Sequence, residues 1–216
     1  MKVSKINSKY VKPISFLFIY LSLIFISCHG TPDPPEQKTL VDLDKIKTYA
    51  TKAKSYCQNN HLNTDFFILA DLGRHSGLNR FFVWDFATEK IIQECLVSHG
   101  CASNPWSSDA SRDKPVFSNM DNSHCSSLGK YTIGERGYSQ WGIHIKYLLH
   151  GLDATNSNSL RRVIVLHSWD SVAEEEPYPR GTPEGWGCPA ISNENMKLLD
   201  GRLRNAGQQV LLWVVE

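Results

Sequence analysis

The spacing of apolar residues predicts two helices in this chain. Segment 39–60 has apolar residues three and four positions apart, and its start, Thr39 followed by Asp42, resembles a capping box. We expect this helix to pack on the domain as a structural brace. A second helix is predicted over 193–205, where apolar residues fall on one face.

Shorter apolar runs predict strands. Runs of apolar and β-branched residues bounded by turn formers are typical of strands. The predicted strands cover residues 66–70, 81–86, 91–97, 131–133, 141–149, 163–166 and 210–215. Many strands with few helices predict a mainly β fold, a β-sandwich with one N-terminal helix and one helix near the C-terminus.

The start of the chain has a different pattern. Residues 1–28 are typical of a bacterial export signal, with lysines before an apolar run that is short for a membrane span, so we expect cleavage. The run ends in Phe25-Ile26-Ser27-Cys28, which resembles a lipobox, so Cys28 would become the lipidated N-terminus. An ordinary signal peptide cleaved nearby is the alternative. Residues 29–38 carry three prolines and no apolar anchor, which predicts a flexible linker.

Composition and charge limit the classes of function. A chain of 216 residues with 41% hydrophobic residues and six tryptophans is large enough for one domain with a sizeable core. The net charge is +1 and no basic stripe appears along the chain. We therefore expect no nucleic-acid partner, and we expect a monomer.

One stretch, 161–192, combines the residue types that a cysteine nucleophile needs. His167 ends a predicted strand, and Cys188 lies 21 positions later on a glycine-rich turn. Because a cysteine reacts as thiolate, it needs a base and positive potential nearby. His167 can take the proton, and a helix capped at Ser192 would direct its amide dipoles toward Cys188. The glycines on either side of Trp186 allow backbone N–H groups to approach a reacting carbonyl.

This arrangement, strand-His-Ser, a loop, then Gly-Cys and a helix, resembles the catalytic motif of the murein L,D-transpeptidases (YkuD-type domains), here in a variant branch with a lipoprotein signal. The resemblance implies that Cys188 is the nucleophile acylated by a peptidoglycan stem peptide and that His167 is its base. It also implies that the backbone carbonyl of Ser168 orients the imidazole and that Gly187 belongs to the oxyanion turn. The implied fold is an L,D-transpeptidase-like β-sandwich, which we assign to residues 61–216, and the chemistry needs no cofactor.

Two positions around the cysteine depart from the family pattern. The histidine usual two places before it is Trp186, and the arginine or asparagine usual two places after it is Ala190. The motif therefore provides no group for the substrate carboxylate. Our candidate substrate-binding residues are Trp186, Trp169 and His150. Trp169 could instead pack in the core, and His150 is also the reserve candidate for the base.

The segment 98–129 is long, polar and without a sustained period. Such loops are usually functional, and the family places a substrate-covering loop here, so we predict a lid; a disordered insertion is the alternative. This segment contains Ser98-His99-Gly100-Cys101, whose residue types match the family signature better than those around Cys188 do. We still prefer Cys188, because no strand-His-Ser element precedes Cys101 at the required spacing and no helix follows it.

The remaining cysteines leave alternatives open. In an oxidising compartment, Cys101 and Cys125 could form a disulfide that pins the lid, and buried free thiols are equally expected. His99, Cys101, His124 and Cys125 also have ligand types that suit zinc. Adjacent residues 124 and 125 are awkward ligands for one tetrahedral ion, however, so we predict no metal.

Together these features predict an exported, periplasmic protein that a lipid on Cys28 anchors to a bacterial membrane. We expect it to form peptidoglycan cross-links by transferring an acyl group from a stem tetrapeptide through Cys188. Hydrolysis of stem peptides by an L,D-carboxypeptidase or amidase at the same site is one alternative. A non-catalytic wall-binding lipoprotein with a structural Cys188 is another. The expected partners are peptidoglycan stem peptides and, through the lipid, the membrane.

Overall fold

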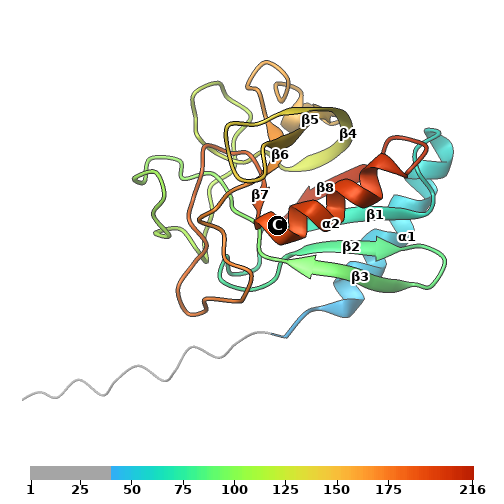
Figure 1. Cartoon of the computed structure of the whole chain (residues 1–216), viewed down its shortest axis with the longest axis horizontal. Coiled ribbons are helices and arrows are strands. Elements are labelled where there is room, and N and C mark those ends of the chain that lie inside the picture. Colours follow the sequence, from blue (N-terminus) through green and yellow to red (C-terminus); the bar gives the residue numbers. More distant parts are fainter. Residues whose placement is uncertain (1–39) are drawn as a thin grey trace, which may run out of the picture. The chain divides into compact units, whose positions relative to one another are not determined.

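The computed structural model describes residues 40–216 (Figure 1). The predicted export signal with Cys28, the linker and the expected helix start at Thr39 lie outside the described residues. Within residues 40–216, no helix has both the length and the apolar character that a membrane span requires.

The described residues form two α-helices, one short 3₁₀ helix and eight strands. The helices are α1 (Leu43–Asn59), η1 (Ala154–Asn156) and α2 (Asn193–Arg204). The strands are β1 (Phe66–Asp71), β2 (Phe81–Asp85), β3 (Lys90–Cys95), β4 (Gly129–Tyr138), β5 (Ile145–Gly151), β6 (Val165–Ser168), β7 (Ala190–Ile191) and β8 (Leu211–Val215). Both predicted helices are therefore present.

The strands form one mixed sheet that is nearly closed into a barrel (Figure 1). Their order is β3-β2-β1-β8-β4-β5-β6-β7. The pairs β1–β8 and β6–β7 are parallel, and the other neighbours are antiparallel. The predicted mainly β, L,D-transpeptidase-like fold, with an N-terminal helix and one helix after Cys188, is confirmed, and its strands share a single sheet.

Helix α1 covers one face of this sheet. Its N-cap is Asp42, whose carboxylate accepts a hydrogen bond from the backbone N of Lys45 at 2.8 Å. Its buried residues share a hydrophobic cluster with β1, β2 and β8. These residues, Ile46, Ala50, Ala53 and Cys57, have the helical spacing seen in the sequence. The predicted N-terminal helix is therefore present, and it packs on the sheet.

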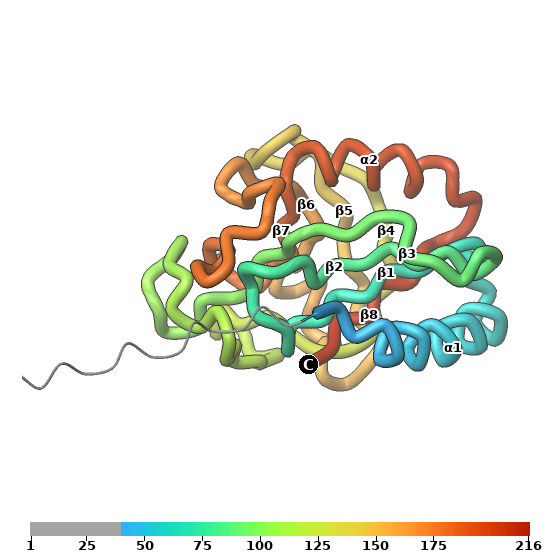
Figure 2. Tube along the Cα trace, turned by 90° about the horizontal axis from the view of Figure 1, so that it is seen from below, coloured from blue at the N-terminus to red at the C-terminus, as the bar shows by residue number. Residues whose placement is uncertain are grey.

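Helix α2 lies on the opposite face, so the sheet separates the two helices (Figure 2). Met196 and Leu199 of α2 are fully buried in a second hydrophobic cluster, which extends over β1, β4, β5 and β6. Side chains of β1 alternate between the two clusters, with Ile68 in the second and Leu69 in the first. This two-sided packing explains why every residue of β1 is buried.

Two predicted strands begin too early. The strand predicted at 141–149 is ordered as β5 only in its second half, because Gly142 and His144 have positive φ values of 55° and 62° and form a turn. The strand predicted at 163–166 is displaced toward its C-terminal end, because Val163 has a φ of 54°. Non-glycine residues such as His144 and Val163 rarely adopt this conformation, so the positions at which these strands begin are hard to predict from the sequence.

Two long loops gather at the end of the sheet where β6 and β7 lie (Figure 1). Residues 96–128 form the first and residues 169–189 form the second. Backbone hydrogen bonds join the first loop to the second at Cys101 and Ser107, which pair with Gly185 and Glu184 at 2.8 and 2.9 Å. The segment predicted as a lid, or as a disordered insertion, is thus an ordered wall of the domain.

Candidate active site

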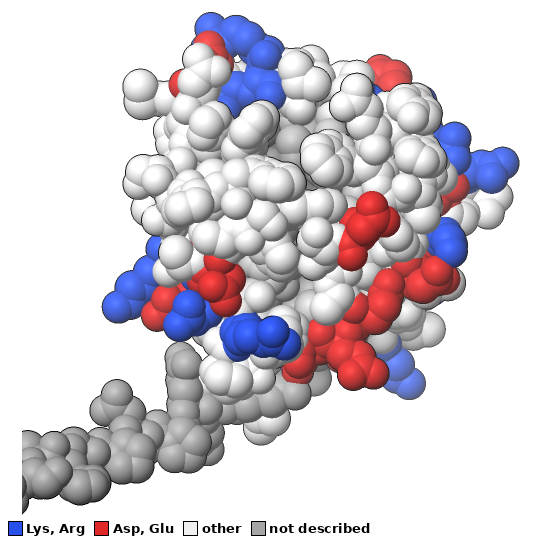
Figure 3. All heavy atoms as spheres, turned by 60° about the vertical axis from the view of Figure 1, so that its left-hand side comes forward, with Lys and Arg blue, Asp and Glu red and all other residues white. Residues whose placement is uncertain are grey.

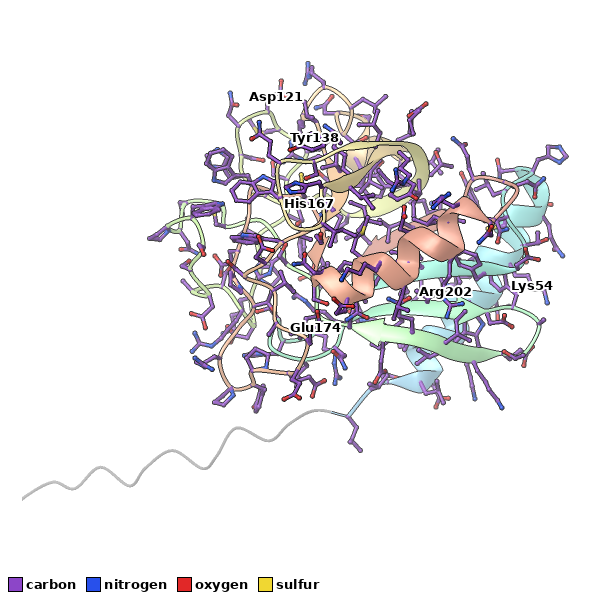
Figure 4. The ribbon with its side chains drawn as sticks, viewed as in Figure 1. Lys54, Asp121, Tyr138, His167, Glu174 and Arg202 are labelled. Atoms are coloured by element: carbon purple, nitrogen blue, oxygen red, sulfur yellow. The ribbon has the colours of Figure 1, made fainter. Side chains whose placement is uncertain are left out.

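His167 and Cys188 lie together at one edge of the sheet. His167 is in β6, which pairs in parallel with β7 so that His167 faces Ala190. The Sγ of Cys188, two residues earlier, lies 3.4 Å from the backbone N of Val165, two positions before His167. Both side chains line one cavity. The structure therefore brings together the nucleophile and the base expected from the sequence. Figure 4 shows His167 at the end of the sheet where the two long loops gather.

The imidazole of His167 has a defined tautomer. Its Nδ1 lies 2.9 Å from the backbone carbonyl oxygen of Ser168. Because a carbonyl oxygen only accepts, Nδ1 carries the hydrogen and Nε2 keeps a free lone pair. Burial lowers the pKa of His167, since the charged ring would lose solvation. The ring is therefore neutral at neutral pH, as a general base must be.

The thiol of Cys188 experiences opposing influences. Burial raises its pKa, while the backbone N–H of Val165 and the cations Arg162 and Lys146 lower it. Burial is the largest of these influences, so the resting thiol is protonated at neutral pH. A base has to take its proton before it can attack, and the neutral imidazole of His167 is suited to that step.

The expected source of positive potential, the N-terminus of α2, is occupied by a carboxylate. Ser192 caps α2 as predicted. Glu174, however, accepts hydrogen bonds from Ser192 Oγ at 2.6 Å and from the backbone N of Glu194 at 3.2 Å. Figure 4 shows Glu174 beside the first turn of α2. Because this negative charge compensates the helix dipole, the helix favours the Cys188 thiolate less than the sequence predicts.

Gly187 fixes the turn before the nucleophile. Its φ is 100°, and a Cβ at this position would lie 2.3 Å from the carbonyl oxygen of Cys125. Only glycine fits both the conformation and the close approach. Arg162 Nη2 donates a hydrogen bond to the same carbonyl of Cys125 at 2.6 Å, and Ser126 Oγ donates one to the carbonyl of Gly187 at 3.3 Å. The turn is therefore held rigidly against the loop that precedes β4.

Two serines support the site in roles that the sequence did not reveal. Ser98 Oγ donates a hydrogen bond to the carbonyl of Cys188 at 3.4 Å and accepts one from the backbone N of Ala190 at 3.1 Å. Ser168 Oγ accepts a hydrogen bond from the backbone N of Ile143 at 3.0 Å, which fixes the turn before β5. Ser168 thus orients the base with its carbonyl and holds a wall of the cavity with its hydroxyl.

A cavity of about 550 Å³ surrounds the thiol and the imidazole. Trp169 and Trp186, two of the predicted substrate-binding residues, line it, and so do Trp106 and Trp141, which the sequence did not single out. Its other lining residues are Ser98, Gln140, His167, Gly185, Cys188 and Ala190. No Lys, Arg, Asp or Glu of the described residues is among them. Figure 3 shows this end of the molecule, mostly uncharged across its middle with charged side chains toward its margins.

A second, polar hollow of about 410 Å³ shares Trp186 with the first. Its remaining lining residues are Asp121, Asn122, His124, Arg161 and Arg162. Arg161 pairs with Asp121 at 3.1 Å. Arg162 donates only to neutral oxygens, and within residues 40–216 it has no carboxylate partner. The hollow thus offers positive charge near the cysteine. The motif itself does not supply this charge, because Ala190 stands at the position where a polar residue is usual.

His150, the third predicted substrate-binding residue, does not line the cavity. It lies on β5, four positions beyond Lys146, which pairs with His167 across the strands. Four strand residues span roughly 13 Å, which places the two histidines far apart. His150 Nε2 lies 2.9 Å from a carboxylate oxygen of Glu135 instead. The structure supports neither substrate binding nor a reserve base at this position.

His99, in the alternative Ser-His-Gly-Cys sequence, has a structural role. Its Nδ1 accepts a hydrogen bond from Arg80 Nη2 at 2.7 Å, and its Nε2 lies 3.0 Å from Ser111 Oγ. Burial and the charge of Arg80 lower the pKa of His99 to about 3. Burial also raises the pKa of Cys101. Because His99 is committed to these contacts, it is unavailable as a base for Cys101, which agrees with the choice of Cys188.

The open alternatives for the other cysteines can be compared with the structure. Cys101 and Cys125 are both buried free thiols. Among residues 40–216, no group of three or more potential ligands is placed to hold a metal ion. The residues weighed as zinc ligands point to other partners: His99 contacts Arg80, and His124 stacks on Trp186 with ring centroids 5.0 Å apart. The donor set weighed for zinc therefore does not converge.

Comparisons with known proteins agree with this geometry. Residues 37–213 match the family described as L,D-transpeptidase catalytic domain (YkuD_2). No curated protein matches the chain. Among solved structures, the chain is similar to the helical cell shape determining protein Pgp2 from Campylobacter jejuni, at 12% identity and a TM-score of 0.43 over 69% of this chain and 46% of that one.

A second solved structure is the L,D-transpeptidase (residues 123–326) from Xylanimonas cellulosilytica, at 9% identity and a TM-score of 0.38. The match covers 69% of this chain and 59% of that one. The chain thus spans about half the length of the solved structures that it matches. At these identities the likeness concerns the fold alone, and the family match over 37–213 is the finding that identifies relatives.

Proposed function

The chain belongs to the L,D-transpeptidase catalytic domain family, and on that premise we propose that it forms peptidoglycan cross-links by cysteine acyl transfer from a stem tetrapeptide. One observation supports this most: the thiol of Cys188 and an imidazole with a free Nε2 line the same cavity. A thiol, a neutral base and a fixed glycine turn are the parts that acyl transfer requires.

In the proposed reaction, His167 Nε2 takes the proton of Cys188 as the sulfur attacks the carbonyl of the third stem residue. The C–N bond to the terminal D-alanine then breaks, and His167 returns the proton to the leaving amine. Backbone N–H groups near Gly187 stabilise the oxyanion. An amine of a second stem finally attacks the thioester and releases the thiol. Water as the acceptor would give L,D-carboxypeptidase activity at the same site.

The polar hollow beside Trp186 is suited to the carboxylate of the donor stem. Arg162 lies there, and because its Nη groups donate to neutral oxygens of the chain, it would attract the carboxylate through its positive charge and not through a bidentate contact. We assign the cell envelope to the protein on its family, with the lipid on Cys28 as the proposed anchor on the periplasmic side of a bacterial membrane. The proposed partners are peptidoglycan stem peptides.

The test is turnover of tetrapeptide muropeptides by the full-length protein in mild detergent, measured by mass spectrometry. We expect Cys188→Ala to abolish both the acyl-enzyme and the product, and Cys101→Ala, a buried thiol in the neighbouring loop, to retain them. The mass of the product separates cross-linking from trimming. Loss of activity in Cys101→Ala alone, or an inert wild type that only binds the wall, would contradict the proposal.

A further inference from the structure

Three tryptophans form a continuous wall beside the nucleophile. Trp106 comes from the loop 96–128, Trp141 from the turn before β5 and Trp169 from the segment after β6. Their ring centroids are 5.1 Å apart for Trp106 and Trp169, 6.0 Å for Trp106 and Trp141, and 6.2 Å for Trp141 and Trp169. Segments far apart in sequence thus bring their aromatic side chains to one place.

The outer rings of this wall are open to solvent. Trp106 is 47% exposed and Trp141 is 45% exposed, whereas Trp169 behind them is only 6% exposed. Large apolar side chains are seldom left exposed together on a soluble domain unless they contact a ligand or a partner. Both exposed rings also line the cavity of Cys188 and His167. The wall is therefore a surface that a bound substrate would cover.

The fold holds the wall in place before any ligand arrives. The turn that carries Trp141 is fixed by the hydrogen bond from Ile143 N to Ser168 Oγ at 3.0 Å. The loop that carries Trp106 is fixed by Glu184, a fully buried carboxylate that accepts hydrogen bonds from Ser111 N at 2.6 Å and Ser108 Oγ at 3.2 Å. A rigid aromatic surface loses little entropy on binding, which favours recognition.

The chemistry of the wall selects a neutral, flat ligand. No Lys, Arg, Asp or Glu of residues 40–216 lines the cavity, and the amide of Gln140 is the polar side chain beside the rings. The three rings contact one another with interplanar angles of 42°, 31° and 67°, so they form an angled platform and not a cage with space for an ammonium group. The negative face of an indole attracts the weakly positive C–H groups on the face of a pyranose ring.

We propose that Trp106 and Trp141 bind a sugar ring of the glycan strand, so that the donor stem is recognised while it is attached to its glycan. This rests on the proposed function for the identity of the substrate. Peptidoglycan offers two chemistries: the stem peptide carries several charges, and the amino sugars are neutral rings with hydroxyl and amide groups. The uncharged platform fits the sugars, and the polar hollow at Arg162 fits the peptide carboxylates.

The test compares two donors for the full-length protein, a disaccharide tetrapeptide and the same tetrapeptide without sugar. We expect wild type to prefer the sugar-bearing donor, and the double variant Trp106→Ala/Trp141→Ala to lower the ratio of kcat/KM for the sugar-bearing donor to kcat/KM for the free tetrapeptide about tenfold. Trp106→Phe/Trp141→Phe should retain part of the preference, because phenyl rings still stack. The control is Trp213→Phe, a half-buried tryptophan that packs on Tyr49 of α1 outside the cavity.

A second measurement does not depend on turnover. Peptide-free glycan oligomers should quench the tryptophan fluorescence of wild type and of Cys188→Ala, and should leave the double variant unchanged. If wild type is inert toward every donor yet binds the oligomers, the proposed function fails and the glycan site stands. Equal use of both donors without quenching would overturn the glycan site. The glycan site would also be overturned if the double variant kept its preference for the sugar-bearing donor and changed only the ratio of hydrolysis to cross-linking. In that case the wall would bind the acceptor amine.

Discussion

At the scale of single residues, the reactivity of Cys188 depends on a cation that the motif does not contain. Burial raises the pKa of the thiol, and Arg162 is the cation that opposes this most. Arg162 Nη2 would lie only 3.2 Å from a Cβ at Gly187, so the guanidinium sits directly behind the nucleophile turn. Within residues 40–216 no carboxylate neutralises it, so its field acts on the thiol with little compensation.

Replacing Arg162 by glutamine should therefore make Cys188 less reactive at neutral pH. We expect the pKa of the thiol to rise further, because one positive group is removed and burial is unchanged. Alkylation by iodoacetamide at pH 7.5 should slow roughly three- to tenfold, and its pH profile should move to higher pH. Arg161→Gln, at the exposed neighbouring arginine, is the matched control. An unchanged pH profile in Arg162→Gln would show that the guanidinium only supports the fold.

The cysteine, histidine and serine that the structure brings to one place could be predicted from the sequence, and the aromatic residues around them could not. His167, Ser168 and Cys188 follow from a local pattern, a strand that ends in His-Ser and a glycine turn before a helix. Trp106 and Trp141 reach the same cavity from a loop and a turn that have no period, so no local signal points to them. His150 lies away from the cavity, which its local sequence could not reveal, because the direction of β5 relative to β6 is a property of the sheet.

At the scale of elements, the two long loops are held together by a buried carboxylate. Glu184, just before the nucleophile turn, accepts hydrogen bonds from the backbone N and the Oγ of Ser111 at 2.6 and 3.0 Å. The backbone N of Glu184 donates to the carbonyl of Ser108 at 2.7 Å. The loop that carries Trp106 and the turn that carries Cys188 are therefore one mechanical unit.

Glu184→Gln should loosen this unit. The amide of glutamine would present a donor where only donors surround the carboxylate, which leaves at least one buried group unsatisfied. We expect a loss of about 1–3 kcal/mol in the free energy of unfolding, measured by urea denaturation. Backbone amides of residues 104–111 should also exchange hydrogen faster. Glu175→Gln, at an exposed position of the same loop, should change neither quantity. Equal protection of 104–111 in both variants would contradict a clamping role.

Helices were easier to predict than strand boundaries, for a physical reason. The apolar face of α1 can be recognised from the spacing of its own residues, because Ile46, Ala50 and Cys57 recur at helical spacing and are buried in the structure. Strand starts near residues 145 and 165 depend instead on positive φ values at His144 and Val163, which are uncommon for residues other than glycine. Those conformations are imposed by the packing of the turns against the rest of the domain.

At the scale of the whole molecule, the buried pair of Arg80 and His99 makes stability depend on pH. The pKa of His99 is lowered from 6.5 to about 3 by burial and by Arg80. Between these values the unfolded chain binds a proton that the folded chain does not. Stability is therefore complete above pH 6.5 and declines as the pH falls toward 3.

The free energy of unfolding should fall by as much as ~1.4 kcal/mol per pH unit through this window because of His99 alone. His99→Gln should be less stable at pH 7 and should show a shallower decline, as measured by urea denaturation between pH 3.5 and 7. His61→Gln, at an exposed position, should keep the slope of wild type. Parallel slopes for wild type and His99→Gln would show that other groups cause the acid sensitivity.

The overall architecture could be predicted only in part. A mainly β domain with one early and one late helix follows from periodicity, and the structure has both. The single, nearly closed sheet could not be foreseen, because it depends on the parallel pairing of Ile68 with Leu212, which are 144 positions apart. Local patterns contain no information about contacts at that separation.

This central pairing has a consequence for the folding of the chain during its synthesis. Strand β8 lies between β1 and β4, so within residues 40–216 the two halves of the sheet are joined through a strand that is made after all the others. During synthesis the earlier strands emerge first and have no central partner to close upon. The sheet can be completed only once β8 is available, and the long-range contacts make that step slow. Until then the sheet stays open, which is the state in which a polypeptide can still be threaded through a narrow channel.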